Sequence, residues 1–202
     1  MARGFSSKEK QAIRLSLIQQ GRELFRKFGF QKTNILDITK NVGIAQGTFY
    51  KFFNSKEELY FVILEIEEQK LREQFAVADI FTEKDPKQSI KNILQQMIEM
   101  IEENSLIREL FIGDTMTHIV KKLSPELLEK HYQNDSFAIE PLLEKLRKEG
   151  FIIEQEPQMI ASILRSFFLL TLHKKEIGES VFDETMEVFI DLIIDGLIKE
   201  GE

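Results

Sequence analysis

Residues 33–59 read TNILDITKNVGIAQGTFYKFFNSKEEL, and this stretch decides the fold. Its apolar residues recur every three or four positions, which predicts two short helices over 35–42 and 46–52. Gly43 lies between the two helices and is expected to take a positive φ, which costs glycine least. Two short helices separated by a tight turn have the spacing of a helix-turn-helix.

Capping residues stand where these helices are expected to begin. Asn34, with Asp37 three residues on, is typical of the N-cap of the first short helix. Ser55 and Glu58 form the pattern of a capping box, which predicts that a long helix begins between them.

The remainder of the chain has the pattern of further helices. A first helix is predicted to end at Gly29, with Phe28 in its apolar stripe. No segment alternates cleanly with the period of a strand. The predicted fold class is all-α, with a three-helix helix-turn-helix domain over residues 1–56. A larger helical domain is predicted over residues 57–202.

The second short helix would present residues that suit the major groove of DNA: Gln46, Gly47, Thr48, Tyr50 and Lys51. A Gln side chain can read a base edge bidentately, and adenine is its usual partner. Gly47 lets the backbone approach closely, and the two hydroxyl groups can donate to phosphates. Lys56 adds an ammonium group at a helix N-terminus, where a phosphate is the natural ligand.

Helix-turn-helix spacing alone is a weak signal, because many helical cores contain a glycine-centred turn, but here the pattern extends further. It comprises Leu24-Phe25, Phe28-Gly29, Thr33, Asp37-Ile38, Val42-Gly43-Ile44, Gly47-Thr48-Phe49-Tyr50, Phe53 and Ser55-Lys56-Glu57-Glu58-Leu59. In these residues the chain resembles the TetR family of bacterial transcriptional regulators. The rest of the chain matches only in length and helical character, because the ligand domains of that family diverge.

The resemblance implies a homodimeric repressor that binds palindromic operator DNA. Residues 1–56 would be its DNA-binding domain, and residues 57–202 its ligand-binding and dimerisation domain. The second short helix would be its recognition helix, with Gln46, Gly47 and Tyr50 nearest the bases. The residues expected to hold the DNA backbone are Thr33, Thr48, Lys51 and Lys56. Phe52 departs from the family pattern, since a His that often touches DNA is common at this position.

Charge is divided unevenly along the chain. The 202 residues have a net charge of -7, but residues 1–56 hold 11 Lys and Arg against three acids, a net of +8. The remaining residues hold 16 basic and 31 acidic groups, a net of −15. This asymmetry favours an anion-binding N-terminal domain with salt-sensitive affinity on an acidic body, and two solvated surfaces of different sign are the alternative.

The composition argues against several other function classes. The chain has no Cys, which excludes disulfides, thiol nucleophiles and Cys-based metal sites. His118, His131 and His173 share no ligand spacing, so no metal is expected. No catalytic set or glycine-rich phosphate loop is recognisable, so neither enzyme activity nor a cofactor is expected. No apolar run reaches the ~18–20 residues of a membrane span, and no signal peptide is recognisable, so a cytoplasmic protein with no membrane partner is expected.

The last two predicted helices are apolar over more than one face. A helix at the surface of a monomer needs only one apolar stripe, so the surplus predicts a four-helix dimer interface. Two-fold symmetry also suits a palindromic operator. The alternative is that these helices lie centrally in the monomer. The predicted interface residues are Ile160, Ile163, Leu164, Phe167, Met186, Phe189, Ile190, Ile193 and Leu197.

An effector pocket among the central helices is implied by the resemblance. Met and Phe clusters suit an adaptable apolar pocket, although they also suit an ordinary core. A small hydrophobic molecule is the favoured effector. The candidate lining residues are Met97, Met100, Phe111, Met116, His118, Tyr132, Phe137, Phe168 and His173.

Two other functions fit parts of the pattern. A helical enzyme or ligand-binding protein that merely contains a helix-turn-helix would not bind DNA. An adaptor would use its apolar C-terminal helices to bind a different protein, and would be monomeric alone. The basic N-terminal domain and the ungapped motif favour the regulator over both.

Overall fold

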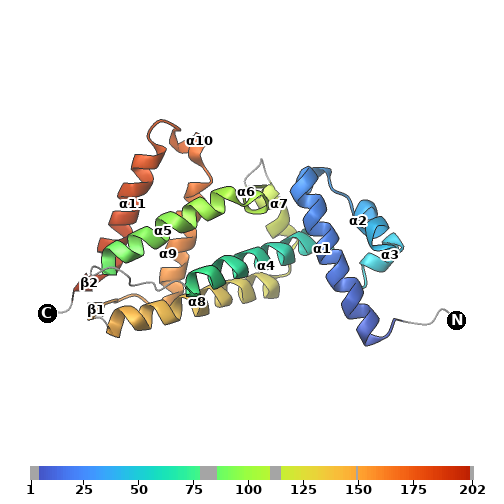
Figure 1. Cartoon of the computed structure of the whole chain (residues 1–202), viewed down its shortest axis with the longest axis horizontal. Coiled ribbons are helices and arrows are strands. Elements are labelled where there is room, and N and C mark those ends of the chain that lie inside the picture. The colour runs from blue at the N-terminus through green and yellow to red at the C-terminus, as the bar shows by residue number, and fades with distance from the viewer. Residues whose placement is uncertain (1–4, 78–85, 110–114, 149, 201–202) are drawn as a thin grey trace. The chain divides into compact units, whose positions relative to one another are not determined.

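The protein is built almost entirely of helices in a computed structural model that describes residues 5–77, 86–109, 115–148 and 150–200 (Figure 1). Two two-residue strands pair antiparallel, with Phe151 opposite Glu200. The all-α prediction is confirmed. None of the helices that the structure describes has the length and apolar character needed to span a membrane. The elements are α1 (Ser7–Lys32), α2 (Ile35–Val42), α3 (Gln46–Phe49), α4 (Lys56–Val77), α5 (Pro86–Glu103), α6 (Ser105–Glu109), α7 (Thr115–Lys122), α8 (Pro125–Lys148), β1 (Phe151–Ile152), α9 (Pro157–Thr171), α10 (Lys174–Ile177), α11 (Phe182–Leu197) and β2 (Lys199–Glu200).

The described chain divides into two compact units, with the boundary inside α4. The head unit comprises residues up to 68 together with α6 and α7, and the body unit comprises the rest. The predicted C-terminal domain, residues 57–202, included α6 and α7, because they follow α5 in the chain. In the structure they pack with the head, so the head contains more than a contiguous helix-turn-helix domain.

An aromatic cluster forms the core of the head. Phe25, Phe30 and Tyr60 are almost fully buried, and both Phe rings meet the Tyr60 ring edge-on at centroid distances of 4.9 and 5.0 Å. The Tyr60 hydroxyl donates to the Leu106 carbonyl at 2.5 Å, which ties α4 to α6. Aromatic side chains bury large apolar areas, so these three account for much of the apolar burial in this small unit.

A kink at Gly29 interrupts α1 three residues before its end. Gly29 has φ 80° and ψ 166°, a backbone conformation essentially restricted to glycine. Phe28, just before the kink, is 48% exposed, and Phe30, just after it, is 1% exposed. The prediction that Phe28 lies in the buried stripe is therefore wrong, because the buried residues before the kink are Leu17, Gly21 and Phe25, and Phe28 lies outside the stripe that they form.

We expect Gly29→Ala to lower the free energy of unfolding by about 2 kcal/mol, because alanine is strained at this φ and ψ. The new Cβ would also lie 2.8 Å from Oε1 of Glu109 and would displace that carboxylate from the Phe30 N–H. Urea denaturation measures the change. Gly196→Ala in α11 is the control, because its Cβ would meet no atom within 4 Å and alanine favours helix. Equal stability of the two variants would contradict the strain argument.

Local capping was predicted well for α2 and less well elsewhere. The Asp37 N–H donates to Asn34 Oδ1 at 2.9 Å, and Gly43 has φ 76°, as predicted. Ser55 Oγ accepts the Glu58 N–H at 3.1 Å, but the Glu58 carboxylate reaches back to Asn54 and not to Ser55. The second short helix ends at Phe49, and the residues after it form turns.

The body unit has a separate apolar core. Helix α8 packs against α9, and α11 packs against both α5 and α9. The core includes Leu94 of α5, Leu143 of α8, Phe167 of α9 and Ile190 of α11, all nearly fully buried. Ion pairs from Lys87 to Asp195 and from Lys91 to Asp191 join α5 to α11 at the surface.

Candidate nucleic-acid interface

Helix α3 has only four residues, so its position depends on what it packs against, because a single turn has little stability of its own. Phe49 is completely buried and Phe53 is 1% exposed, and their ring centroids lie 5.7 Å apart. The guanidinium of Arg14 in α1 lies 4.4 Å from the Phe53 ring centroid and donates to the Phe52 carbonyl. The two Phe side chains therefore fasten α3 and the following turn to the head core.

Four of the five residues predicted to face outward around these anchors are exposed. Gln46, Gly47 and Lys51 are exposed, Tyr50 is 54% exposed, and Thr48 is half-buried. Gly47 has no neighbour within 4 Å of the position that a Cβ would occupy. We call these five residues the reading face. The surface combines hydrogen-bonding side chains, one cation and a bare backbone, which suits contact with base edges and phosphates.

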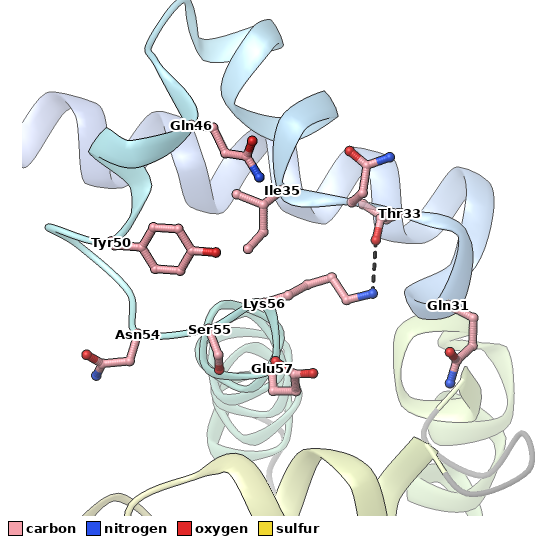
Figure 2. Close-up of a pocket in the computed structure, with 10 residues that line it drawn as sticks. Gln31, Thr33, Ile35, Gln46, Tyr50, Asn54, Ser55, Lys56 and Glu57 are labelled. Carbon is pink, nitrogen blue, oxygen red and sulfur yellow. Dashed lines mark hydrogen bonds between the residues drawn. The ribbon is translucent and has the colours of Figure 1, made fainter.

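An open hollow of about 410 Å³ lies beside the reading face (Figure 2). Gln46 and Tyr50 border it on one side, and Lys56 crosses it toward the end of α1. The N-cap residues of α2 and α4, Asn34 and Ser55, also line it, so the positive ends of two helices border the hollow. The remaining lining residues are Gln31, Thr33, Ile35, Asn54 and Glu57.

Thr33 does not offer its hydroxyl to a ligand at this surface. Its side chain is 3% exposed, and its Oγ1 donates to the Gly29 carbonyl at 2.8 Å. This corrects the expectation that the Thr33 side chain holds a DNA phosphate. The motif places Thr33 at the start of α2, but only the structure shows that its side chain turns back to the kink in α1.

Lys56 also has partners that the sequence did not predict. Its ammonium donates to the Phe30 carbonyl at 2.8 Å and to the Thr33 carbonyl at 2.9 Å. It lies 4.1 Å from the centroid of the Phe30 ring. Burial lowers the pKa of the Lys56 ammonium, and the carboxylate of neighbouring Glu57 opposes that effect. From the sequence, a phosphate was the expected ligand of Lys56. The contact with α1 could not be predicted, because it depends on the tertiary fold.

Glu57 contacts α7 through His118. The His118 Nε2 lies 2.7 Å from Glu57 Oε1 within the head unit. Burial raises the pKa of Glu57, but hydrogen bonds from its own backbone N–H, His118 and Ser55 outweigh burial and hold the pKa below its usual value. His118 was predicted to line an effector pocket. In the structure its side chain is 51% exposed and contacts the Glu57 carboxylate at the start of α4.

Part of the positive charge of residues 1–56 is neutralised inside the head. Glu67 of α4 is only 4% exposed and pairs with both Arg22 and Arg26 of α1. The Arg26 Nη2 lies 2.6 Å from Glu67 Oε2. The sequence does not predict this network, because Glu67 lies in the acidic part of the chain. Within residues 5–56 of the head, the basic residues that remain exposed without such pairing to Glu67 are lysines: Lys8, Lys10, Lys27, Lys32, Lys40 and Lys51.

The predicted dimer-interface residues divide by burial within the body unit. Ile160, Phe167, Met186 and Ile190 are at most 4% exposed in the core, so they present no side-chain surface to a second chain. Phe189 is exposed, and the other predicted members are half-buried. This corrects the prediction for the four core residues, because periodicity identifies an apolar stripe without showing which side it faces. The exposed apolar residues of α9 and α11 that lie outside the predicted interface set are Met159, Leu170, Val188 and Leu192.

The predicted pocket residues lie in both units. Met97 and Phe168 are half-buried in the body, where Tyr132 and His173 are exposed. Met116 is half-buried in the head. Phe111 and the side chains of Met100 and Phe137 lie outside the described residues. The lining of an effector pocket therefore stays a prediction.

Comparisons with known proteins agree with this architecture. The sequence model of the family described as bacterial regulatory proteins, tetR family, matches residues 17–63. A TetR-family transcriptional regulator from Pectobacterium atrosepticum has a similar structure, with a TM-score of 0.72 and 19% identity, over 98% of this chain and 100% of that chain. No curated protein sequence matches the chain.

Two further solved structures contain ligands. RolR, solved in complex with resorcinol, is 19% identical with a TM-score of 0.66, over 95% of this chain and 90% of that chain. SmeT is the repressor of the Stenotrophomonas maltophilia multidrug efflux pump SmeDEF. Its triclosan complex is 17% identical with a TM-score of 0.56, over 95% of this chain and 94% of that chain. At these identities the likeness shows a shared fold.

Proposed function

We propose, on the premise that this chain is a TetR-family regulator, that it represses transcription by binding palindromic operator DNA as a homodimer. A small hydrophobic effector releases it from the operator. The proposal rests on one observation: α3 exposes polar residues while Phe49 and Phe53 are buried in the head core and hold it in place. They place hydrogen-bonding groups and a bare glycine backbone on a rigid support, as a recognition helix requires.

In this proposal some residues of the reading face contact bases and the others contact phosphates. Gln46 reads a base edge, with adenine its usual partner, and Gly47 lets the backbone approach the groove. Tyr50, Thr48 and Lys51 bind the DNA backbone and fix the register of the protein on the duplex.

Gln46→Ala is expected to change sequence preference more than overall affinity. Loss of a bidentate base contact removes about 1–3 kcal/mol of discrimination at one base pair. The measurement is selection of bound duplexes from random DNA, followed by titration of operators substituted at each position. Lys51→Ala is the control and should weaken binding to all duplexes alike. If Gln46→Ala weakened every operator variant equally, Gln46 would not read a base, and absence of any selected duplex for the wild type would reject the proposed function.

Exposed apolar side chains on α9 and α11 support the proposed homodimer. Met159 and Leu170 of α9 and Val188, Phe189 and Leu192 of α11 are 38–63% exposed, and the two helices pack against each other in the body. Exposed apolar side chains gathered on two neighbouring helices favour an interaction site there. A two-fold dimer joins the same face of two copies and supplies the symmetry that a palindromic operator requires.

Leu192→Glu is expected to convert the dimer to a folded monomer, because Leu192 is 63% exposed and a carboxylate on each chain would be buried beside its symmetry mate. Sedimentation equilibrium gives the mass, and circular dichroism checks the fold. Glu187→Lys, an exposed change on the same helix, is the control and should remain dimeric. A Leu192→Glu protein that stays dimeric would place the interface elsewhere.

The effector part of the proposal is supported by the ligands of the structurally similar proteins. RolR is solved with resorcinol and SmeT with triclosan, and both ligands are small aromatic molecules. Half-buried Met97 and Phe168 in the body unit suit such a ligand. An effector that prefers the conformation unable to bind DNA would lower operator affinity, and such couplings are typically about 1–3 kcal/mol.

A further inference from the structure

The corner between α1 and α2 is held by side chains that come from three different places in the head. The kink at Gly29 frees the Phe30 N–H, which donates to Glu109 Oε1 of α6 at 3.2 Å. The Thr33 hydroxyl donates to the Gly29 carbonyl at 2.8 Å. The corner therefore lacks continuous helical hydrogen bonding and depends on side chains to keep its shape.

The ammonium group of Lys56 holds the other side of this corner. It donates to the Thr33 carbonyl at 2.9 Å (Figure 2). It also donates to the Phe30 carbonyl at 2.8 Å, and its Nζ lies 4.1 Å from the centroid of the Phe30 ring. Carbonyl groups at a helix end lack intrahelical partners and carry partial negative charge. One lysine thus satisfies two such carbonyls and joins the start of α4 to the end of α1.

These contacts make Lys56 a poor phosphate ligand. An ammonium group has three donors, and two of them already bind carbonyls. Moving the group to a phosphate would break both bonds and its contact with the Phe30 ring. Lys51 provides the contrast, because its side chain is exposed and its one described contact is with the Phe5 ring at 5.9 Å.

We infer that Lys56 is a positioning residue for DNA binding, which fixes the α1–α2 corner and thereby the orientation of the reading face, and is not itself a phosphate ligand. The inference rests on the proposed function, since it requires that the reading face bind DNA. Lys56, Asn34, Gln46 and Tyr50 all border the same hollow, so a shift of the corner moves the start of α2 relative to α3.

The test compares Lys56→Met with Lys51→Met in titrations of a labelled operator duplex at several salt concentrations. Lys51→Met should reduce the slope of log affinity against log salt by about 0.9 per protomer, because one phosphate contact is lost. Lys56→Met should lower affinity by about tenfold or more at every salt concentration, since charge-assisted hydrogen bonds are lost, while the slope stays that of the wild type. Lys56→Arg should restore part of the affinity, because a guanidinium can also donate to both carbonyls.

A slope reduced by Lys56→Met as much as by Lys51→Met would overturn the inference, and so would unchanged affinity. If Lys56→Met does not fold, reductive methylation of the wild type followed by mass spectrometry decides the question. Lys56 should react slowly with and without DNA, whereas Lys51 should become protected only when DNA is added. A Lys56 that reacts as fast as Lys51 and is protected only by DNA would be a phosphate ligand. Failure of the wild type to bind any duplex would instead reject the proposed function.

Discussion

Raising the salt concentration from about 50 to about 200 mM should lower operator affinity by about 10³-fold, if the dimer makes roughly six phosphate contacts. The physical reason is release of counterions from DNA as lysines neutralise its phosphates. Three exposed lysines on each head would supply these contacts, and Lys51 of the reading face is the first candidate. Fluorescence anisotropy of a labelled duplex measures the affinity at each salt concentration.

The structure also sets an upper limit on this salt dependence. Arg22 and Arg26 are paired with buried Glu67, and Lys56 is bonded to two carbonyls. These groups should not exchange for counterions when DNA binds. The slope should therefore be near −5, well short of the value expected if all the basic residues of both heads touched phosphates. Affinity independent of salt would refute the electrostatic account, and a slope several units steeper would show that the internal pairs open on DNA.

Phe49→Ala should abolish DNA binding, because it removes the buried side chain that anchors α3 to the head core. Phe49 is completely buried, and truncating a buried Phe costs about 3–5 kcal/mol. That loss is a large fraction of the total stability of a typical domain, about 5–15 kcal/mol. Thermal denaturation followed by circular dichroism measures the stability, and anisotropy measures the binding.

Tyr50 is the matched control because it is the next residue in the chain and has the opposite exposure. It is 54% exposed, so Tyr50→Ala should change stability by less than about 0.5 kcal/mol while weakening DNA binding. Tyr50→Phe keeps the ring and removes only the hydroxyl, which isolates the proposed phosphate contact. A Phe49→Ala protein that binds DNA like the wild type would show that α3 does not depend on this anchor.

The sequence predicted the parts of the head that depend on neighbouring residues. The Asn34 cap and the positive φ of Gly43 follow from local backbone chemistry, and the outward face of α3 follows from the spacing of Phe49 and Phe53. Each of these features depends on residues only a few positions apart. This is why the pattern predicted both the helix-turn-helix and the residues of its exposed face.

Most of the features that the sequence did not predict depend on residues far apart in the chain. The bonds of Lys56 reach carbonyls 26 and 23 positions away, whereas the Thr33 hydroxyl bonds to the kink only four residues before it. The pairing of Glu67 with two arginines joins an acidic segment to a basic one, so a tally of charge by segment could not reveal it. In α9 and α11, apolar residues lie on both the inner and the outer face, and composition alone does not distinguish the two.

The approach of Glu109 to the kink has an evolutionary consequence. Its carboxylate reaches the Phe30 N–H only because Gly29 lacks a Cβ, which would lie 2.8 Å from Oε1. Positions 29 and 109 should therefore be epistatic. Loss of the acid should make loss of the glycine less harmful, since the steric conflict disappears and only the backbone strain remains. The test is a library randomised at both positions and selected for repression. The pairs of residues that are tolerated together should differ from those expected by combining the residues tolerated at each position alone.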